Sequence, residues 1–171
     1  MQNPVKKYDL FLSYAHVDYD WVYSNLFIPL SHCVKKSDGR APVIFFDRDG
    51  KTGIKSGANF VTMIATALSQ SENYVFAISE IYPSRPNCQY EYTYALTYDV
   101  TGEEGRLHPL LIDDKAKLPI EMKIFHYNET KDPLWFAKLC DALNLETVCG
   151  TRKLVFLTSP QRTFVDNTLA V

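Results

Sequence analysis

The sequence predicts an α/β domain of the flavodoxin-like, doubly wound kind, with about five parallel strands and helices on both faces of the sheet. Three observations lead to this class. Short runs of residues are apolar on both faces, as in buried parallel strands. Amphipathic stretches with helical spacing separate these runs. The two kinds of segment alternate along the chain, so right-handed βαβ crossovers are expected to connect the strands.

The length of the chain fits one such domain. Its 171 residues are enough to bury a core without disulfides or a structural metal. We expect residues 1–149 to form this domain. Another apolar run, Leu154–Ser159, follows a complete set of alternating elements. Residues 150–171 are therefore expected to be a linker, an added edge strand or the truncated start of a further domain.

Five segments are predicted as strands. Each is a compact apolar run that ends at small polar or charged residues, and the last of them is the weakest. They are Tyr8–Tyr14, Pro42–Phe46, Tyr74–Ser79, His108–Asp113 and Lys123–Tyr127.

The first two predicted helices follow the first two strands. From Asp18 onward apolar residues recur at helical spacing as far as Cys33, and Pro29 should kink or divide this helix. Ser56 is the candidate cap of the second helix. The apolar stripe of that second helix consists of Phe60, Ile64, Ala67 and Leu68.

Two further helices are predicted later in the chain. One begins near Asn87 as its cap and runs to about Tyr98. The last begins at Asp132, because a proline directly follows this capping residue. Its inner stripe consists of Phe136, Leu139 and Leu143.

Composition excludes several classes of function. The net charge of −2 gives no electrostatic case for binding nucleic acid directly or an anionic membrane. The 4 cysteines contain no CxxC pair, and the 4 histidines show no metal-ligand spacing. No signal peptide and no long apolar span is present. We therefore expect a cytoplasmic protein with reduced thiols, without a metal site and without a membrane anchor.

The loop after the second strand, Asp47–Gly57, is rich in glycine and charge, which is typical of binding loops. Its Asp-x-Asp-Gly start is shared with calcium loops, but Ala58 stands where such a loop requires a bidentate Glu. The loop also lacks the GxxxxGK[ST] pattern of a phosphate cradle, and no GxGxxG follows the first strand. Calcium and dinucleotide-fold chemistry are therefore excluded.

Glu91 is the strongest candidate for chemistry. Cys88, Glu91, Tyr92 and Ala95 fall on one face of the third helix, the face that should pack on the sheet. Acids in the first turn commonly complement the helix dipole and reach solvent. Ligands, however, bind at the carboxyl ends of strands in open parallel sheets, and this helix begins there. A partly buried acid at that edge favours a functional role.

Three motifs in this order resemble a Toll/interleukin-1 receptor (TIR) domain over about residues 6–145. The segment YDLFLSYAHVDYDWV (8–22) is similar to the family's opening motif. GIKSGANFVTMIATAL (53–68) resembles its second loop and following helix. ISEIYPSRPNCQYE (78–91) resembles its Ser, Tyr, Ser and Cys-x-x-Glu segment. The family contains both NAD-cleaving enzymes and signalling adaptors.

In the enzymatic members a Glu at the position of Glu91 is essential, and the spacing from Cys88 is kept here. The resemblance therefore implies an NAD+ nucleosidase that releases nicotinamide and leaves ADP-ribose or a cyclic isomer. NAD+ is the substrate, and no cofactor is implied. The expected role is that of an immune, antiphage effector. The chief alternative is a non-catalytic module that signals by TIR–TIR contact.

The resemblance implies substrate contacts from five more residues: Ser13, Tyr14, Asp47, Arg48 and Phe60. By residue pattern alone, Ser13 and Asp47 are also typical turn caps, Arg48 a solvated charge and Phe60 a core residue.

The family motif usually has Trp directly before its Cys, where this chain has Asn87. Tyr82, Tyr90 and Phe60 are the candidates to replace this aromatic wall. Enzymatic relatives complete their pocket with the second loop of a neighbouring subunit. Self-association through Asp47–Gly57 is therefore implied, with a sensor domain in the same or another chain as trigger.

A receiver-like phosphorylation domain is a third interpretation on a similar fold. It needs a carboxylate cluster at the end of the first strand, whereas this strand ends in Ser-Tyr-Ala-His, residues 13–16. The sequence disfavours it.

Overall fold

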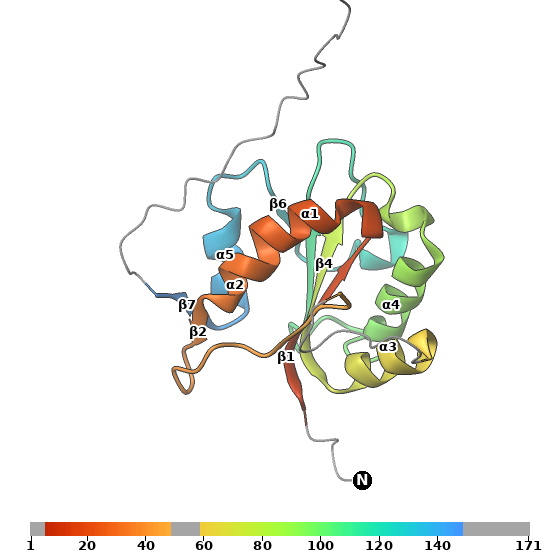
Figure 1. Cartoon of the computed structure of the whole chain (residues 1–171). Helices are drawn as coiled ribbons and strands as arrows, with labels where there is room; N and C mark the ends of the chain where they lie inside the picture. The colour runs from red at the N-terminus through yellow and green to blue at the C-terminus, as the bar shows by residue number, and fades with distance from the viewer. Residues whose placement is uncertain (1–5, 49–58, 149–171) are drawn as a thin grey trace, which may run out of the picture.

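The computed structural model describes residues 6–48 and 59–148. Its main sheet has five strands in the order β3-β1-β4-β5-β6, and every neighbouring pair is parallel. This arrangement confirms the predicted flavodoxin-like fold class (Figure 1). The strands are β1 (Tyr8–Tyr14), β3 (Ile44–Phe45), β4 (Ser71–Ile78), β5 (Leu107–Leu111) and β6 (Asn128–Glu129).

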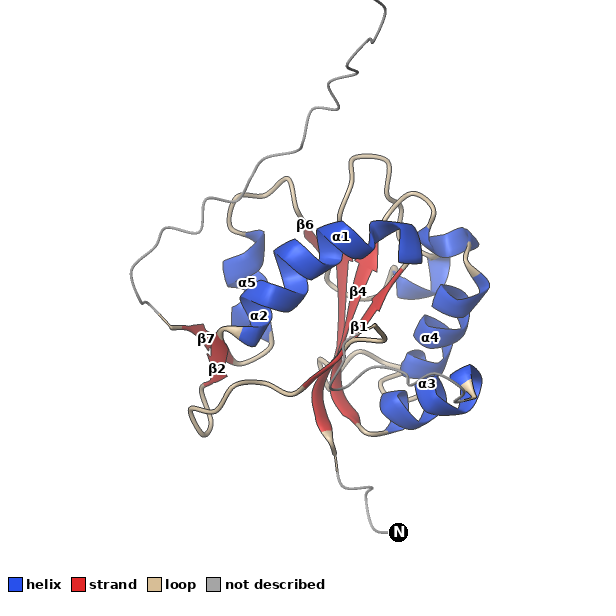
Figure 2. Ribbon diagram, in the orientation of Figure 1, coloured by secondary structure: helices blue, strands red, loops and turns tan. Residues whose placement is uncertain are grey.

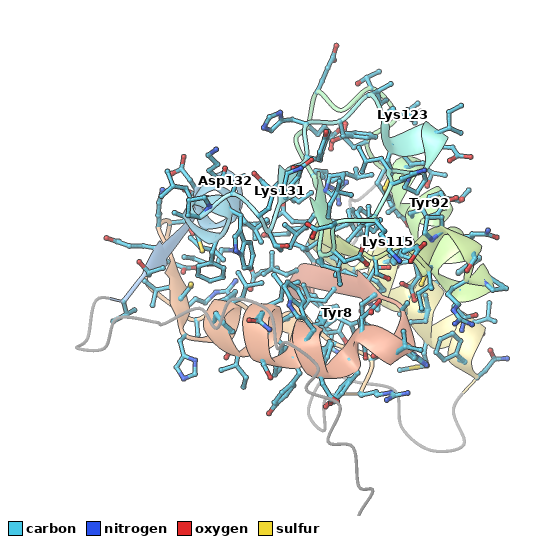
Figure 3. The ribbon with its side chains drawn as sticks, turned by 90° about the horizontal axis from the view of Figure 1, so that it is seen from above. Tyr8, Tyr92, Lys115, Lys123, Lys131 and Asp132 are labelled. Atoms are coloured by element: carbon cyan, nitrogen blue, oxygen red, sulfur yellow. The ribbon has the colours of Figure 1, made fainter. Side chains whose placement is uncertain are left out.

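Helices cover both faces of this sheet (Figure 2). One face carries α1 (Tyr19–Val22), α2 (Ile28–Ser31) and α5 (Trp135–Ala142), and the other carries α3 (Phe60–Ser69) and α4 (Pro86–Leu96). In the view from above in Figure 3, Tyr92 marks α4 and Asp132 marks the approach to α5 on opposite sides of the molecule. A separate hydrophobic core fills each side of the sheet.

Strand β1 explains why there are two cores. Its side chains alternate between the faces, so Leu10 and Leu12 pack into the core beneath α1, α2 and α5. Phe11, which lies between them, packs into the core beneath α3 and α4. Every residue of β1 is buried, as a strand that is apolar on both faces requires.

Pro29 does divide the first helix, although the chain does not leave its helical path. A π-helical segment, η2 (Tyr23–Phe27), separates α1 from α2 and ends just before Pro29. Proline removes an N–H from the hydrogen-bond ladder, and a wider π turn accommodates the loss.

The predicted end of this helix at Cys33 is wrong. Cys33 begins strand β2 (Cys33–Lys35), which pairs antiparallel with β7 (Leu145–Thr147). Cys33 is nevertheless buried in the same core as the helix stripe, so its burial does not distinguish a helix from a strand.

The predicted helix starts are corrected in two places. Asn59 caps α3 by accepting a hydrogen bond from the Thr62 amide, and the predicted cap Ser56 lies outside the described residues. Asn87 lies inside α4, whose N-cap is Arg85. Pro86 explains this shift, since its fixed φ suits the first helical position.

Helix α5 starts two residues later than predicted, with Leu134 in place of Asp132 as its N-cap. Asp132 accepts a hydrogen bond from the Leu134 amide, and the helix runs from Trp135 to Ala142. The predicted stripe residues Phe136, Leu139 and Leu143 are all buried.

The predicted position of the fifth strand is wrong. Residues 123–125 form a turn and a bend after a short 3-10 helix, η4 (Ile120–Met122), residues 126–127 are irregular, and the strand is Asn128–Glu129. The apolar side chains of this segment follow a three-residue period, because Met122 and Phe125 are buried while Ile124 is exposed. Phe125 donates its amide to the Met122 carbonyl, as in a tight helical turn.

No helix in the described ranges 6–48 and 59–148 combines the length and apolar character needed to span a membrane. The predicted linker or edge strand at residues 150–171 lies outside these ranges.

Asp9, near the amino end of β1, is the centre of a charge network. Its carboxylate accepts hydrogen bonds from Lys35 at 2.5 Å, from Arg40 at 2.7 and 2.8 Å and from the Val43 amide at 2.6 Å. Burial alone raises the pKa of Asp9, but the hydrogen bonds from Arg40 and Lys35 outweigh burial and lower it to about 2. This network ties β1 to the segment that leads into β3.

Replacing Asp9 by Asn is expected to lower the free energy of unfolding by about 2 kcal/mol, because it leaves Lys35 near an uncharged partner. The stabilisation from Asp9 is present above its unfolded pKa and is lost as the pH falls through about 2. Urea unfolding at neutral pH measures the change. Asp141→Asn is the control, since its pair with Lys36 is exposed and should contribute little.

Candidate active site

A cavity of about 340 Å³ opens at the carboxyl edge of the sheet. The described walls come from the end of β1, the short helix η1 (His16–Asp18), Asp47 two residues after β3, α3 and the start of α4. Phe11, Tyr14 and Ile64 supply apolar surface, while Asp47 and Glu91 supply carboxylates. The position agrees with the rule that open parallel sheets bind ligands at this edge.

Glu91 lies in the wall of this cavity and is only 8 % exposed. The predicted inner face of the helix is confirmed, since Cys88, Glu91, Tyr92 and Ala95 are the buried residues of α4. A carboxylate therefore sits on the stripe of α4 that packs on the sheet.

One hydroxyl group contacts Glu91 from the protein side, and a second contacts the first. Ser13 Oγ lies 2.5 Å from Glu91 Oε2, and Tyr82 Oη lies 2.6 Å from Ser13 Oγ. Tyr82 belongs to η3 (Tyr82–Ser84) and is fully buried. The sequence suggests Tyr82 as an aromatic wall, but it packs behind the carboxylate and is not one of the described residues that line the cavity.

Burial is the largest effect on Glu91 and raises its pKa to about 8. The hydrogen bond from Ser13 lowers this pKa, and the charge of Asp47 raises it slightly. At neutral pH this pKa keeps the carboxyl group mostly protonated. A cationic ligand in the cavity would favour the carboxylate form.

Asp47 and Tyr14 meet across the cavity mouth. Tyr14 donates its hydroxyl to Asp47 Oδ1, and His16 Nε2 lies 2.8 Å from Asp47 Oδ2. Burial, and then the Asp47 carboxylate, raise the pKa of Tyr14 above its usual range, so the phenol stays a donor. The parallel register of β1 with β3 brings these residues together, pairing Phe11 with Phe45.

Arg48 and Phe60 are not among the described residues that line the cavity. The Arg48 guanidinium lies over the Tyr19 ring, 5.3 Å from its centroid. Phe60 is partly buried and packs against the core beneath α3 and α4. Of the predicted loop Asp47–Gly57, only Asp47 and Arg48 lie within the described residues.

Of the predicted contact residues, Tyr14 and Asp47 line the cavity and Ser13 does not, and His16, Arg85 and Asn87 line it as well. His16 gave no signal in the sequence, because its partner Asp47 is 31 residues away. Asn87 is exposed on the cavity wall, at the position where the resemblance expects Trp.

Cys88 lies one helical turn before Glu91 and also lines the cavity. Burial, and then the charge of Glu91, raise the pKa of the Cys88 thiol to about 12. A neutral thiol is a poor nucleophile. Within the described residues, no cluster of three or more His, Cys, Asp or Glu side chains could hold a metal ion.

Comparison with solved structures finds the same fold in other proteins. The chain is similar to the TIR domain of the Toll-related receptor TRR-2 from Hydra magnipapillata, with a TM-score of 0.62 and 20% identity, covering 80% of this chain and 98% of that one. It is also similar to a TIR-STING receptor from C. gigas solved in complex with 2',3'-cGAMP, with a TM-score of 0.57 and 16% identity. That match covers 84% of this chain and 41% of the receptor. At these identities the likeness shows the fold alone.

Comparison with curated protein sequences gives no match. A family model described as the TIR domain, however, matches residues 10–142. This range begins in β1 and ends at the last residue of α5, so it includes most of β1, the other four strands of the main sheet and the whole described cavity. The chain therefore belongs to the TIR domain family.

Proposed function

We propose that this chain is an NAD+ nucleosidase, which breaks the bond between nicotinamide and ribose. The observation that carries the proposal is the position of Glu91, a buried carboxylate in the wall of a cavity at the carboxyl edge of the sheet. Membership of the TIR family supports it, because the family includes enzymes that depend on a Glu at this position.

The reaction suits a site with one reactive carboxylate. When the C1′–N bond breaks, nicotinamide leaves as a neutral molecule and needs no proton, while the ribose becomes an oxocarbenium-like cation. A negative Glu91 beside the ribose would stabilise this cation. Attack by water then gives ADP-ribose and a proton, and attack by an adenine or ribose atom gives a cyclic isomer. Chromatography of the products distinguishes the two outcomes.

The cavity volume supports self-association as part of this function. At about 340 Å³ it lies at the small end of the range for small-molecule sites, so it suits the nicotinamide–ribose half of the substrate. We propose that the loop Asp47–Gly57 of a second copy completes the site over the rest of NAD+. A sensor domain that brings copies together would then act as the trigger of an antiphage immune effector.

The decisive experiment incubates the purified chain with NAD+ over a range of protein concentrations, with and without a crowding agent, and measures free nicotinamide. We expect activity per mole of protein to rise with concentration, because each complete site needs two copies. An absence of nicotinamide release under every oligomerising condition would contradict the enzyme and favour the TIR–TIR signalling module.

Asn87→Trp is expected to lower the KM for NAD+ about tenfold, since Asn87 is exposed on the cavity wall. An indole there can stack on the nicotinamide ring, and base–aromatic stacking contributes about 1–3 kcal/mol. Steady-state kinetics of nicotinamide release measure the change. Gln89→Trp is the control, because Gln89 is exposed on the same helix and is not among the described lining residues. An unchanged KM in Asn87→Trp would show that this wall does not contact the ring.

A further inference from the structure

Tyr82 and Ser13 connect Glu91 to the interior of the protein. The three side chains come from η3, β1 and α4, and all three are buried. The distances are 2.6 Å between the Tyr82 and Ser13 hydroxyl oxygens and 2.5 Å between Ser13 Oγ and Glu91 Oε2. They form a continuous hydrogen-bonded path that ends at the cavity.

The direction of this path follows from the donors available. An ionised carboxylate only accepts hydrogen bonds, so Ser13 must donate its single hydrogen to Glu91. The Ser13 oxygen then accepts from Tyr82, whose hydroxyl stays protonated because burial raises its pKa well above the ordinary value. Hydrogen bonds to a charged acceptor are stronger than neutral ones, so the path favours the ionised form of Glu91.

We propose that Tyr82 is a positioning residue, which acts through Ser13 to hold the Glu91 carboxylate toward the cavity and to stabilise its ionised form. Ser13 is then a support of Glu91, in place of the substrate contact that the family resemblance implied. The importance of this path for catalysis rests on the proposed NAD+ cleavage, whereas its effect on Glu91 itself does not.

No other described group takes the place of this path. Ser13 is the only hydrogen-bond donor to Glu91 among the described residues. From α3 the cavity receives Ile64, which cannot ionise. The remaining titratable or charged side chains in the described cavity wall are Tyr14, His16, Asp47, Arg85 and Cys88.

Among these, Asp47 opposes ionisation of Glu91, since its negative charge raises the pKa of the carboxyl group. Tyr14 and His16 are engaged with Asp47. The thiol of Cys88 is neutral because burial raises its pKa. Arg85 is not among the groups that shift the pKa of Glu91, so the hydrogen bond from Ser13, to which Tyr82 is joined, is the described interaction that offsets burial.

The test compares Tyr82→Phe and Ser13→Ala with the unmodified chain. The side-chain carboxyl ¹³C shift of Glu91 is followed from pH 5 to 10, and kcat/KM for nicotinamide release is measured over the same range. We expect Tyr82→Phe to raise the midpoint of the Glu91 titration by about one pH unit, because it removes one hydrogen bond from the series that ends at the Glu91 carboxylate. At pH 7 kcat/KM should fall about tenfold, and at pH 10 it should return to within about twofold.

Ser13→Ala should move the titration further than Tyr82→Phe, and Ser13→Thr should restore it, because threonine keeps the hydroxyl. Two buried hydroxyls in the first half of β4, away from the cavity, provide matched controls. Tyr74 donates to the Leu68 carbonyl at 2.8 Å and Ser71 to the Ala67 carbonyl at 2.7 Å. Tyr74→Phe and Ser71→Ala should leave the Glu91 titration unchanged.

An unshifted Glu91 titration in Tyr82→Phe would overturn the inference, whether or not Ser13→Ala shifts it. So would a loss of activity in Tyr82→Phe that is equal at every pH, because that is the behaviour of a general packing defect. If the unmodified chain releases no nicotinamide at any pH, the proposed function fails, and the ¹³C titration still decides whether the path exists.

Discussion

Glu91→Gln is expected to reduce nicotinamide release by about 1000-fold, the size of effect seen when a preorganised charge-stabilising group is removed from an active site. Glutamine keeps the shape of the side chain, and its carbonyl oxygen can still accept the hydrogen bond from Ser13. It lacks the negative charge that would stabilise the ribose cation. The loss should therefore appear in kcat, with little change in KM.

Initial rates of nicotinamide release at saturating NAD+ check this expectation. Glu103→Gln is the control, because Glu103 is an exposed carboxylate and does not line the cavity. Retention of more than about a tenth of the activity in Glu91→Gln would contradict a charge-based role for this residue.

The same substitution is expected to stabilise the folded chain at alkaline pH. Burial raises the folded-state pKa of Glu91 to about 8, from 4.5 in an exposed side chain. Between these values the unfolded chain releases a proton that the folded chain retains, so stability falls as the pH rises through this window. A glutamine side chain has no proton to release in this range, so Glu91→Gln would remove this loss of stability.

Urea unfolding of both chains at pH 5 and pH 9 measures the effect. We expect the gain of Glu91→Gln over the original chain to be small at pH 5 and larger at pH 9, by up to about 4 kcal/mol. Glu103→Gln should show no such dependence, since its carboxylate is exposed. An equal gain at both pH values would mean that packing, and not ionisation, is responsible. A stabilising change that abolishes activity is the pattern expected where a protein retains a destabilising group for function.

Sequence by itself determined the main features of the fold. The run Tyr8–Tyr14 is apolar at nearly every position, and the strand it forms is buried on both faces. The spacing of Cys88, Glu91 and Ala95 is enough to place a carboxylate on the inner face of α4. Both features depend on local periodicity, which a single segment of sequence reports directly.

Periodicity is less informative where an element is short. The segment after β5 has buried residues at Met122 and Phe125, and its apolar content predicts a strand over Lys123–Tyr127. The strand that pairs with β5 is Asn128–Glu129, which has no apolar residue. Backbone hydrogen bonds at the edge of the sheet decide such a strand, and they leave no pattern in the side chains.

Only the tertiary structure decided what surrounds Glu91. Ser13 is 78 residues from Glu91 in sequence and 69 from Tyr82, and the three meet because β1, η3 and α4 converge at one edge of the sheet. His16 and Asp47 are joined in the same way by the parallel pairing of β1 with β3. A sequence pattern shows which face of an element is buried, whereas register and packing between distant elements determine which polar side chains touch.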